Sequence, residues 1–209
     1  MLFNVIQKGV FIVLWFPVRL IFHFFLHYKV ESKEDLSSLK GPLIIASNHT
    51  SFLDPFLIGA AFPIFSQIYP IRYATWYRYY YIFWPFINLF GAFPVRKKIG
   101  LEKTLRRGIR ILEKGGVVGI FPEGKRRHLG RPRKPRRGVA FLAAKTNSPI
   151  LPILIEGTIG LSVKEFLFRR RFVTIKIGEK FFLPKYDISR KKGLNYLAEL
   201  ILNKIKELK

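Results

Sequence analysis

Cysteine is absent from this 209-residue chain, methionine occurs once, and acidic residues number only 13 against 37 Lys and Arg. Without cysteine the chain forms no disulfide and has no thiol to act as a nucleophile or a metal ligand. The formal charge of +24 favours anionic partners, which include nucleic acids, acidic lipid surfaces and phosphorylated substrates. Charge alone does not choose among these partners.

The N-terminal segment, residues 1–28, has neither a signal-peptide cleavage site nor an uninterrupted span. No Ala, Gly or Ser lies between residues 10 and 31 to form such a site. A span of about 20 apolar residues would place Arg19 near its middle, at a cost of roughly 2.5–3.5 kcal/mol. We therefore expect a membrane-associated segment of two helical pieces bent at Pro17, lying in one leaflet with Trp15 in lipid and Arg19 at the headgroups. A true span and a core helix are the alternatives.

The remaining residues, 29–209, fit one domain in which strands and helices alternate. Residues 31–40 are predicted to be a polar connector, and residues 56–94 helices broken by prolines. Strands are expected at 43–47, 117–121, 150–156 and 172–177, and helices at 98–113, 138–146 and 193–208. This alternation implies an α/β fold with a mixed, partly parallel sheet flanked by helices, whose ligands gather at the carboxyl ends of strands.

The peptide at 48–55, Asn-His-Thr-Ser-Phe-Leu-Asp-Pro, pairs a lone histidine with a lone carboxylate, since no other acidic residue lies between positions 36 and 101. Five residues set His49 and Asp54 about 140° apart on an ideal helix, so they meet only if the chain turns between them. The junction after the strand at 43–47 supplies such a turn. The functional interpretation makes His49 a general base whose second ring nitrogen donates to Asp54.

A structural interpretation of the same peptide needs no catalysis. Ser51 and Asp54 match a capping box, in which Asp54 closes a helix N-terminus and His49 is a polar loop residue. Thr50 and Ser51 are also good N-cap residues. The spacing alone favours this structural interpretation. A second peptide, at a matching position after a strand, makes the functional interpretation the favoured one.

That second peptide, Phe-Pro-Glu-Gly-Lys-Arg-Arg at 121–127, ends a predicted strand in a glycine hinge and three cations. Gly124 lets the backbone approach a ligand closely. Arg126 is able to grip phosphate oxygens with two nitrogens, and Lys125 adds a point charge. Together the two peptides suggest a base that deprotonates a hydroxyl near a bound phosphate.

Glu123 is the odd group in this peptide, because it is the only acid between positions 114 and 155. It either holds the arginines in place or accepts a hydrogen bond from a substrate hydroxyl. Residues 125–137 hold eight Lys and Arg and no acid, and for residues 131–137 a solvated basic loop is the favoured interpretation.

Residues 76–90 hold two Trp, four Tyr and three Phe. Core packing is the default role for such rings. The alternatives are that they line an acyl groove or lie at a bilayer interface. The four tyrosines, nearly side by side, do not all face one core.

Over residues 41–180 the chain resembles the lysophospholipid acyltransferase family, most closely its bacterial 1-acylglycerol-3-phosphate acyltransferases. The resemblance rests on four blocks in the family's order: 48–55, 91–97 (Gly-Ala-Phe-Pro-Val-Arg-Lys), 121–126 and 148–153 (Ser-Pro-Ile-Leu-Pro-Ile). The first is similar to the family's catalytic His-x4-Asp block and the second to its substrate-phosphate block. Lys125 stands where a small hydroxyl residue is usual, and Arg127 where Ser is frequent. The arginine that ends the second block aligns with either Arg96 or Lys97.

The resemblance implies that residues 29–209 form an acyltransferase domain that moves a fatty acyl group from a thioester to the sn-2 hydroxyl of lysophosphatidic acid. The product would be phosphatidic acid, in phospholipid biosynthesis. The implied site residues are His49 and Asp54 for catalysis and Arg96, Lys97, Glu123, Gly124, Lys125 and Arg126 for substrate binding. Backbone N–H groups near Gly124, or at the helix start after His49, are candidates to stabilise the oxyanion.

Acyl-CoA or acyl-carrier protein is the expected co-substrate, with no metal and no further cofactor. The phospholipid membrane is the expected partner, with no nucleic acid. The expected location is the cytoplasmic face of the cell membrane, the inner membrane of a bacterium, as a monotopic or peripheral protein.

Three alternatives stay open on the sequence. A sister acyltransferase would act on glycerol-3-phosphate or another lysolipid. A nucleic-acid-binding module would explain the charge but leaves the apolar N-terminus unexplained, and no recognition helix or RNA-reading sheet signature is present. A non-catalytic membrane-surface module is the third.

Overall fold

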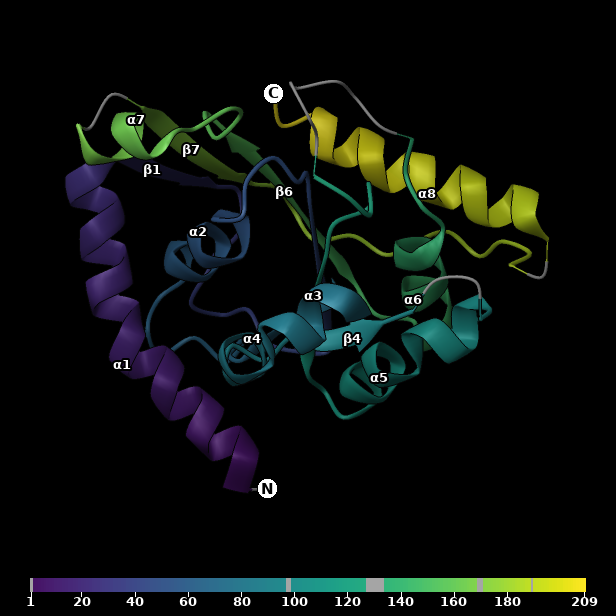
Figure 1. Ribbon diagram of the computed structural model, residues 1–209. Coiled ribbons are helices and arrows are strands. Elements are labelled where there is room, and N and C mark those ends of the chain that lie inside the picture. The colour runs from purple at the N-terminus through teal and green to yellow at the C-terminus, as the bar shows by residue number, and fades with distance from the viewer. Residues whose placement is uncertain (1, 97–98, 127–133, 169–170, 189) are drawn as a thin grey trace.

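A seven-stranded sheet, within the described residues, is the frame of the computed structural model (Figure 1), which describes residues 2–96, 99–126, 134–168, 171–188 and 190–209. The strands are β1 (His27–Ser32), β2 (Leu43–Ser47), β3 (Ile71–Trp76), β4 (Phe93–Val95), β5 (Val117–Ile120), β6 (Ile150–Glu156) and β7 (Phe172–Ile177). The helices are α1 (Leu2–Phe25), α2 (Asp54–Ala61), α3 (Tyr77–Ile82), α4 (Trp84–Leu89), α5 (Leu101–Glu113), α6 (Gly138–Thr146), α7 (Val163–Leu167) and α8 (Lys191–Lys206).

The strand order is β1-β7-β6-β2-β5-β3-β4. The five strands from β6 to β4 pair in parallel, β7 is antiparallel to β6, and β1 is parallel to β7. The predicted mixed, partly parallel α/β sheet is therefore confirmed. Because β6, β2, β5, β3 and β4 run the same way, their carboxyl ends meet along one edge, where ligands bind in such sheets.

Helices cover both faces of this sheet (Figure 1). Alternate residues of β2 face opposite sides: Leu43 and Ile45 pack with α1 and α2, whereas Ile44 and Ala46 pack with α5, α6 and α8. All five residues of β2 are buried. A strand covered on both faces reads as a continuous apolar run, which is why β2 is visible in the sequence.

Three strands were not predicted. β1 is a polar, partly exposed edge strand that occupies the start of the expected connector at 31–40, and its composition has no apolar run to reveal it. β3 and the three-residue β4 lie in the stretch expected to be broken helices. β3 follows a proline, alternates buried and half-buried residues at its start and has aromatic residues typical of strands, but it lies inside a long apolar stretch interrupted by prolines, which does not mark it off from its neighbours. The expected boundary after residue 28 falls inside β1.

The N-terminal segment is one helix where two helical pieces were expected, and its axis changes direction partway along its length (Figure 1). α1 is one continuous helix with Pro17 inside it. Two side chains on either side of the proline hold it to the end of α2: Trp15 Nε1 donates to the Phe62 carbonyl at 2.8 Å, and an Arg19 guanidinium N–H donates to the Ala60 carbonyl at 3.0 Å. These contacts support the helix where the proline removes a backbone hydrogen bond.

Arg19 and Trp15 therefore bind protein carbonyls, where headgroup and lipid contacts were expected. The Arg19 guanidinium also lies 4.9 Å from the centre of the Trp15 ring. Further along, Phe22 and Leu26 are buried in the core. The opposite side of the helix is apolar and exposed, with Ile12, Val13, Phe16, Leu20, Ile21 and Phe24. Of the helices in the described part of the chain, none combines the length and the apolar character needed to cross a bilayer.

Arg19→Met should lower the free energy of unfolding by about 1 kcal/mol, because a charged hydrogen bond near the C-terminus of α2 is lost. Urea unfolding in mild detergent measures this, with His23→Met as the control, an exposed residue of the same helix. Equal midpoints for the two variants would show that the Arg19 contact adds nothing to the docking of α1.

Candidate active site

His49 and Asp54 are in direct contact at the carboxyl end of β2. Asp54 is the first residue of α2 and is fully buried. One oxygen of its carboxylate, Oδ2, faces His49 Nδ1 at 2.8 Å and accepts hydrogen bonds from the backbone N–H of Thr50 at 2.7 Å and of Ser51 at 2.9 Å. These three groups offset the cost of burying a carboxylate. The turn that the sequence required between the two residues is therefore closed by Asp54 itself.

Asp54 Oδ2 makes both the contact that the structural interpretation requires and the contact that the functional interpretation requires. Asp54 does bind the Ser51 N–H as in a capping box. The Ser51 hydroxyl, however, accepts from the Leu53 N–H at 3.1 Å, and Leu53 is an N-cap without a side-chain hydrogen bond. The box is therefore half formed, and the carboxylate that would complete it also orients His49.

A stack of rings holds the other side of His49. Its imidazole lies 4.0 Å from the Phe121 ring at an interplanar angle of 13°, and the Tyr73 ring follows at 6.0 Å from Phe121. A Cβ at Gly119 would collide with the Tyr73 ring, so this glycine makes room for the stack. Sequence reasoning missed the stack, because its members come from three separate segments of the chain: the loop after β2, the end of β5 and the interior of β3.

Tyr73 also supports the first turn of α2. Its hydroxyl donates to the Pro55 carbonyl at 3.2 Å. Burial first, and then the neighbouring Tyr69 and Asp54, raise the pKa of Tyr73 well above its usual value. The phenol therefore stays protonated at neutral pH and remains a donor.

Asn48 clamps the loop that carries His49 to β6. Its side-chain N–H donates to the Ile155 carbonyl at 2.8 Å, and its side-chain oxygen accepts from the Ile155 N–H at 2.7 Å. The buried hydroxyls of Thr50 and Thr158 form a second link to the same strand end. Asn48 and Thr50 flank His49, so the loop is fixed on each side of the histidine. The sequence analysis gave Asn48 no role of its own.

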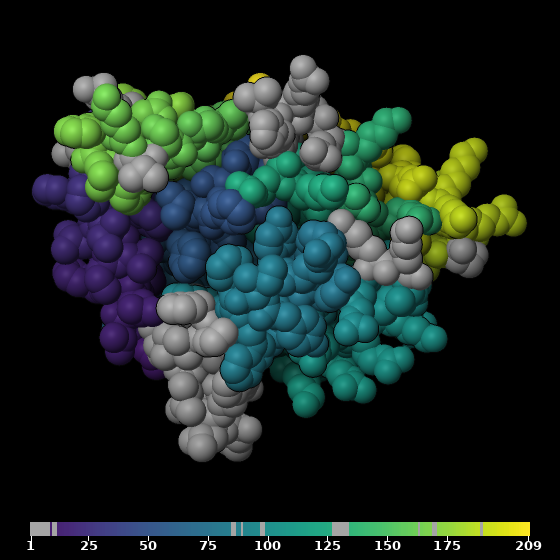
Figure 2. Space-filling model, viewed as in Figure 1, coloured from purple at the N-terminus to yellow at the C-terminus, as the bar shows by residue number. Residues whose placement is uncertain are grey.

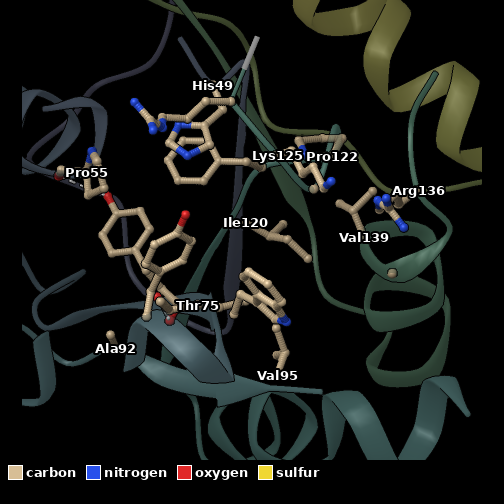
Figure 3. A pocket seen from close by; sticks show the side chains of 18 of the residues that line it. His49, Pro55, Thr75, Ala92, Val95, Ile120, Pro122, Lys125, Arg136 and Val139 are labelled. Atoms are coloured by element: carbon tan, nitrogen blue, oxygen red, sulfur yellow. Dashed lines mark hydrogen bonds between the residues drawn. The ribbon is translucent and has the colours of Figure 1, made fainter. Parts of the chain in front are cut away.

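A cavity of about 1210 Å³ opens beside His49. Figure 3 shows His49, Lys125 and Arg136 around one side of it, with Thr75 and Val95 on the opposite side. Residues of α1, α2 and α3 give it apolar walls, and its lining contains no carboxylate. The cavity therefore has an apolar part and a cationic part, with an imidazole on its surface.

Of the predicted substrate-binding residues, some line the cavity and others do not. Gly124, Lys125 and Arg126 line the cavity, and the Arg126 guanidinium lies 3.3 Å from the centre of the Phe52 ring. Glu123 is buried and is outside the lining. Arg96 is exposed, also outside the lining, with its guanidinium 5.3 Å from the centre of the Tyr77 ring. Lys97, the other candidate in the second block, lies outside the described residues.

Arg136 and Arg137 also line the cavity, although the sequence analysis assigned them to a solvated loop. The backbone N–H of Arg136 donates to the Pro122 carbonyl at 2.7 Å. Gly124 has a positive φ of 65°, and a Cβ there would collide with the Arg136 side chain. The glycine hinge thus lets a third basic residue, Arg136, lie across the turn beside Lys125 and Arg126.

Four backbone N–H groups near His49 are already engaged. Those of Thr50 and Ser51 donate to Asp54, that of Leu53 donates to Ser51, and that of Gly124 donates to the Phe121 carbonyl at 2.9 Å. These four amides, the obvious oxyanion donors on the sequence, are used to build the site. In the part of the chain that the structure describes, no three His, Asp or Glu side chains are grouped to hold a metal ion.

Comparison with known proteins identifies the class. The family model described as Acyltransferase matches residues 27–156. The chain belongs to this acyltransferase family, as the four sequence blocks predicted. The 1-acyl-sn-glycerol-3-phosphate acyltransferase of Bacillus subtilis is 29% identical over 86% of this chain and 87% of its own length.

Two chloroplastic 1-acyl-sn-glycerol-3-phosphate acyltransferases also match. LPAT1 of Arabidopsis thaliana is 30% identical over 71% of this chain, and BAT2 of Brassica napus is 27% identical over 81% of it. The chain spans about half the length of these two relatives, 45% and 49%. Among solved structures, the 1-acyl-sn-glycerophosphate (LPA) acyltransferase PlsC from Thermotoga maritima matches with a TM-score of 0.62 and 23% identity, over 93% of this chain and 80% of that one. This chain shares the PlsC fold.

Asn48→Ala should lower the free energy of unfolding by about 3 kcal/mol, because the buried N–H and carbonyl of Ile155 both lose their partner. Asn48→Asp keeps an acceptor for the N–H but sets a buried carboxylate oxygen against the Ile155 carbonyl, so it should be at least as destabilising as Asn48→Ala. Urea unfolding measures both variants, with the exposed Asn203→Ala on α8 as the control. A loss at Asn48 no larger than that at Asn203 would rule out the clamp.

Proposed function

We propose that this protein transfers a fatty acyl group from a thioester to the sn-2 hydroxyl of lysophosphatidic acid, giving phosphatidic acid. The observation that supports it is the contact between His49 Nδ1 and the buried carboxylate of Asp54, at the edge of a cavity lined by Lys125 and Arg126. The relatives from Bacillus, Arabidopsis and Brassica are named for this activity.

The proposed base is Nε2 of His49. An ionised carboxylate only accepts hydrogen bonds, so Asp54 selects the tautomer with the proton on Nδ1 and leaves the Nε2 lone pair for substrate. As the acceptor hydroxyl attacks the thioester carbonyl, Nε2 takes its proton, and Asp54 stabilises the imidazolium. The C–S bond then breaks, and the leaving thiolate receives that proton. An ester and a thiol result, and no side chain is acylated.

The cavity suits an amphiphilic acceptor. Lys125, Arg126, Arg136 and Arg137 offer the charges that bind a phosphate, while the walls from α1 and α2 suit an acyl chain. Its volume of about 1210 Å³ exceeds the roughly 300–1,000 Å³ usual for one small ligand, as expected for a site that holds acceptor and donor together. Holding the hydroxyl between base and thioester supplies much of the rate.

We place the enzyme at the cytoplasmic face of a cell membrane, as a monotopic or peripheral protein. The exposed apolar side of α1 is the surface proposed to rest in one leaflet. Acyl-CoA and acyl-carrier protein are both anionic, and either suits a chain with a formal charge of +24. The proposed reaction needs no further cofactor.

His49→Ala and Asp54→Asn should each lower kcat by roughly 10²–10⁴-fold with little change in KM, since a general base acts in the transition state. A radiolabel assay offers both thioester donors against lysophosphatidic acid, other lysolipids and glycerol-3-phosphate. His27→Ala is the matched control, because that ring stacks on Phe172 in the sheet. Unchanged kcat in His49→Ala would remove the proposed base, and a preference for glycerol-3-phosphate would replace the proposed acceptor.

Arg126→Ala and Arg136→Ala should each raise the KM for lysophosphatidic acid about tenfold, the effect of losing one charged contact to a phosphate. The matched control is Lys134→Ala, an exposed cation of the same segment that does not line the cavity. Arg96→Ala, also outside the lining, is expected to have less effect. A larger KM change at Arg96 than at Arg126 would move the phosphate to the second block.

A further inference from the structure

Four consecutive apolar side chains at the end of α3 and the start of α4 are exposed. They are Tyr81, Ile82, Phe83 and Trp84, with exposed fractions of 58%, 67%, 53% and 51%. We name this group the aromatic ridge. None of the four lines the cavity. An isolated exposed apolar residue is ordinary, whereas a contiguous group marks an interaction surface.

The local structure fixes the ridge in this exposed position. Tyr80 is the one described tyrosine of α3 that is buried, and its hydroxyl donates to the Asn88 side chain at 3.1 Å. The N–H of Phe83 bonds the Tyr79 carbonyl, and the Ile87 N–H bonds the Phe83 carbonyl, so the chain continues from α3 into α4 as a rigid turn. The four side chains between these anchors are exposed.

Neighbouring residues of β3, α3 and α4 form part of the wall of the cavity. Trp76, Tyr79 and Ile87 line it. On the other side of the cavity, α1 contributes Trp15 and its neighbours to the lining. The ridge and the exposed apolar side of α1 therefore belong to elements that line the same cavity. Figure 2 shows α1 in purple at the left and the surface of α3 and α4 in steel blue at the centre of the same face.

The sequence on either side of the ridge carries charge of one sign. Residues 55–101 contain five Lys and Arg and no acid. Two of these cations lie over aromatic rings next to the ridge: the Arg78 guanidinium is 5.6 Å from the centre of the Trp76 ring, and that of Arg96 is 5.3 Å from Tyr77. Aromatic side chains flanked by cations match the interface of an anionic bilayer, where rings lie at headgroup depth and cations contact phosphates.

We propose that the aromatic ridge inserts into the interfacial region of an anionic phospholipid bilayer, as a second contact in addition to α1. The opening of the cavity then faces the lipid surface, and an acceptor reaches His49 without crossing water. This consequence rests on the proposed function. The binding itself does not, because it is measured without turnover.

The test is the partition of the full-length protein into vesicles of equimolar phosphatidylglycerol and phosphatidylcholine. The ridge variant combines Ile82→Ser, Phe83→Ser and Trp84→Ser and should bind about tenfold more weakly, because three side chains lose apolar burial in lipid. The control variant combines Phe182→Ser, Tyr186→Ser and Tyr196→Ser, which are 60%, 53% and 53% exposed. None of these three side chains lines the cavity, and the control should bind like the wild type.

Two outcomes would overturn the proposal: a ridge variant that binds like the wild type, or a control variant that loses as much affinity as the ridge variant. The first would leave α1 as the sole lipid contact or assign the ridge to a protein partner. Acyl transfer with the acceptor dispersed in detergent is measured in parallel, and the ridge variant should keep its kcat. A wild-type protein that binds vesicles without transferring an acyl group would refute the proposed function and leave the ridge standing.

Fluorescence gives a second measurement that leaves the ridge intact. The chain has three Trp, so Trp15→Phe with Trp76→Phe leaves Trp84 as the reporter. Vesicles with brominated acyl chains should quench its emission and shift it to the blue. Emission unchanged by vesicles that bind the protein would place Trp84 in water and contradict the proposal.

Discussion

The site depends on one buried oxygen. Asp54 Oδ2 binds the imidazole of His49 and two backbone N–H groups, so one carboxylate both closes the loop after β2 and sets the orientation of the ring. A charge buried without such partners would be strongly destabilising. Because the donors come from the same short peptide, the spacing of five residues is fixed by the turn that the carboxylate closes. The same contacts of Asp54 therefore stabilise the loop and orient the proposed base.

The rest of the fold keeps this arrangement in place against the cavity. Parallel pairing brings the ends of β2, β5 and β6 to one edge, where Asn48 and Thr50 attach the loop to β6 and Phe121 at the end of β5 stacks on His49. The turn after β5 then delivers the basic residues to the same side of the cavity. α1 binds the far end of α2 through Trp15 and Arg19, so the proposed membrane-contacting helix and the helix that begins at Asp54 form one packed unit.

Much of this was visible in the sequence, for physical reasons. β2 and β5 are buried on both faces and read as short apolar runs, and the lone acid and lone histidine stand out against a basic background. Contacts between distant segments were not visible. Eight cations in thirteen residues predict a solvated loop. The structure shows instead that Arg136 packs against the turn at Gly124 and lines the cavity. The polar edge strand β1 has no periodic signal. Pro17 predicted two helical pieces, whereas the contacts of α1 with α2 support one helix that continues through the proline.

The central claim is that the Nε2 lone pair of His49 faces an acceptor hydroxyl whose phosphate is held by the basic residues after Gly124. An experimental structure with lysophosphatidic acid bound and no donor present tests this claim most directly. The account predicts the sn-2 hydroxyl about 2.6–3.2 Å from Nε2, with the phosphate against Lys125 and Arg126. A bound lysolipid whose phosphate lies elsewhere, with its hydroxyl out of reach of His49, would contradict it.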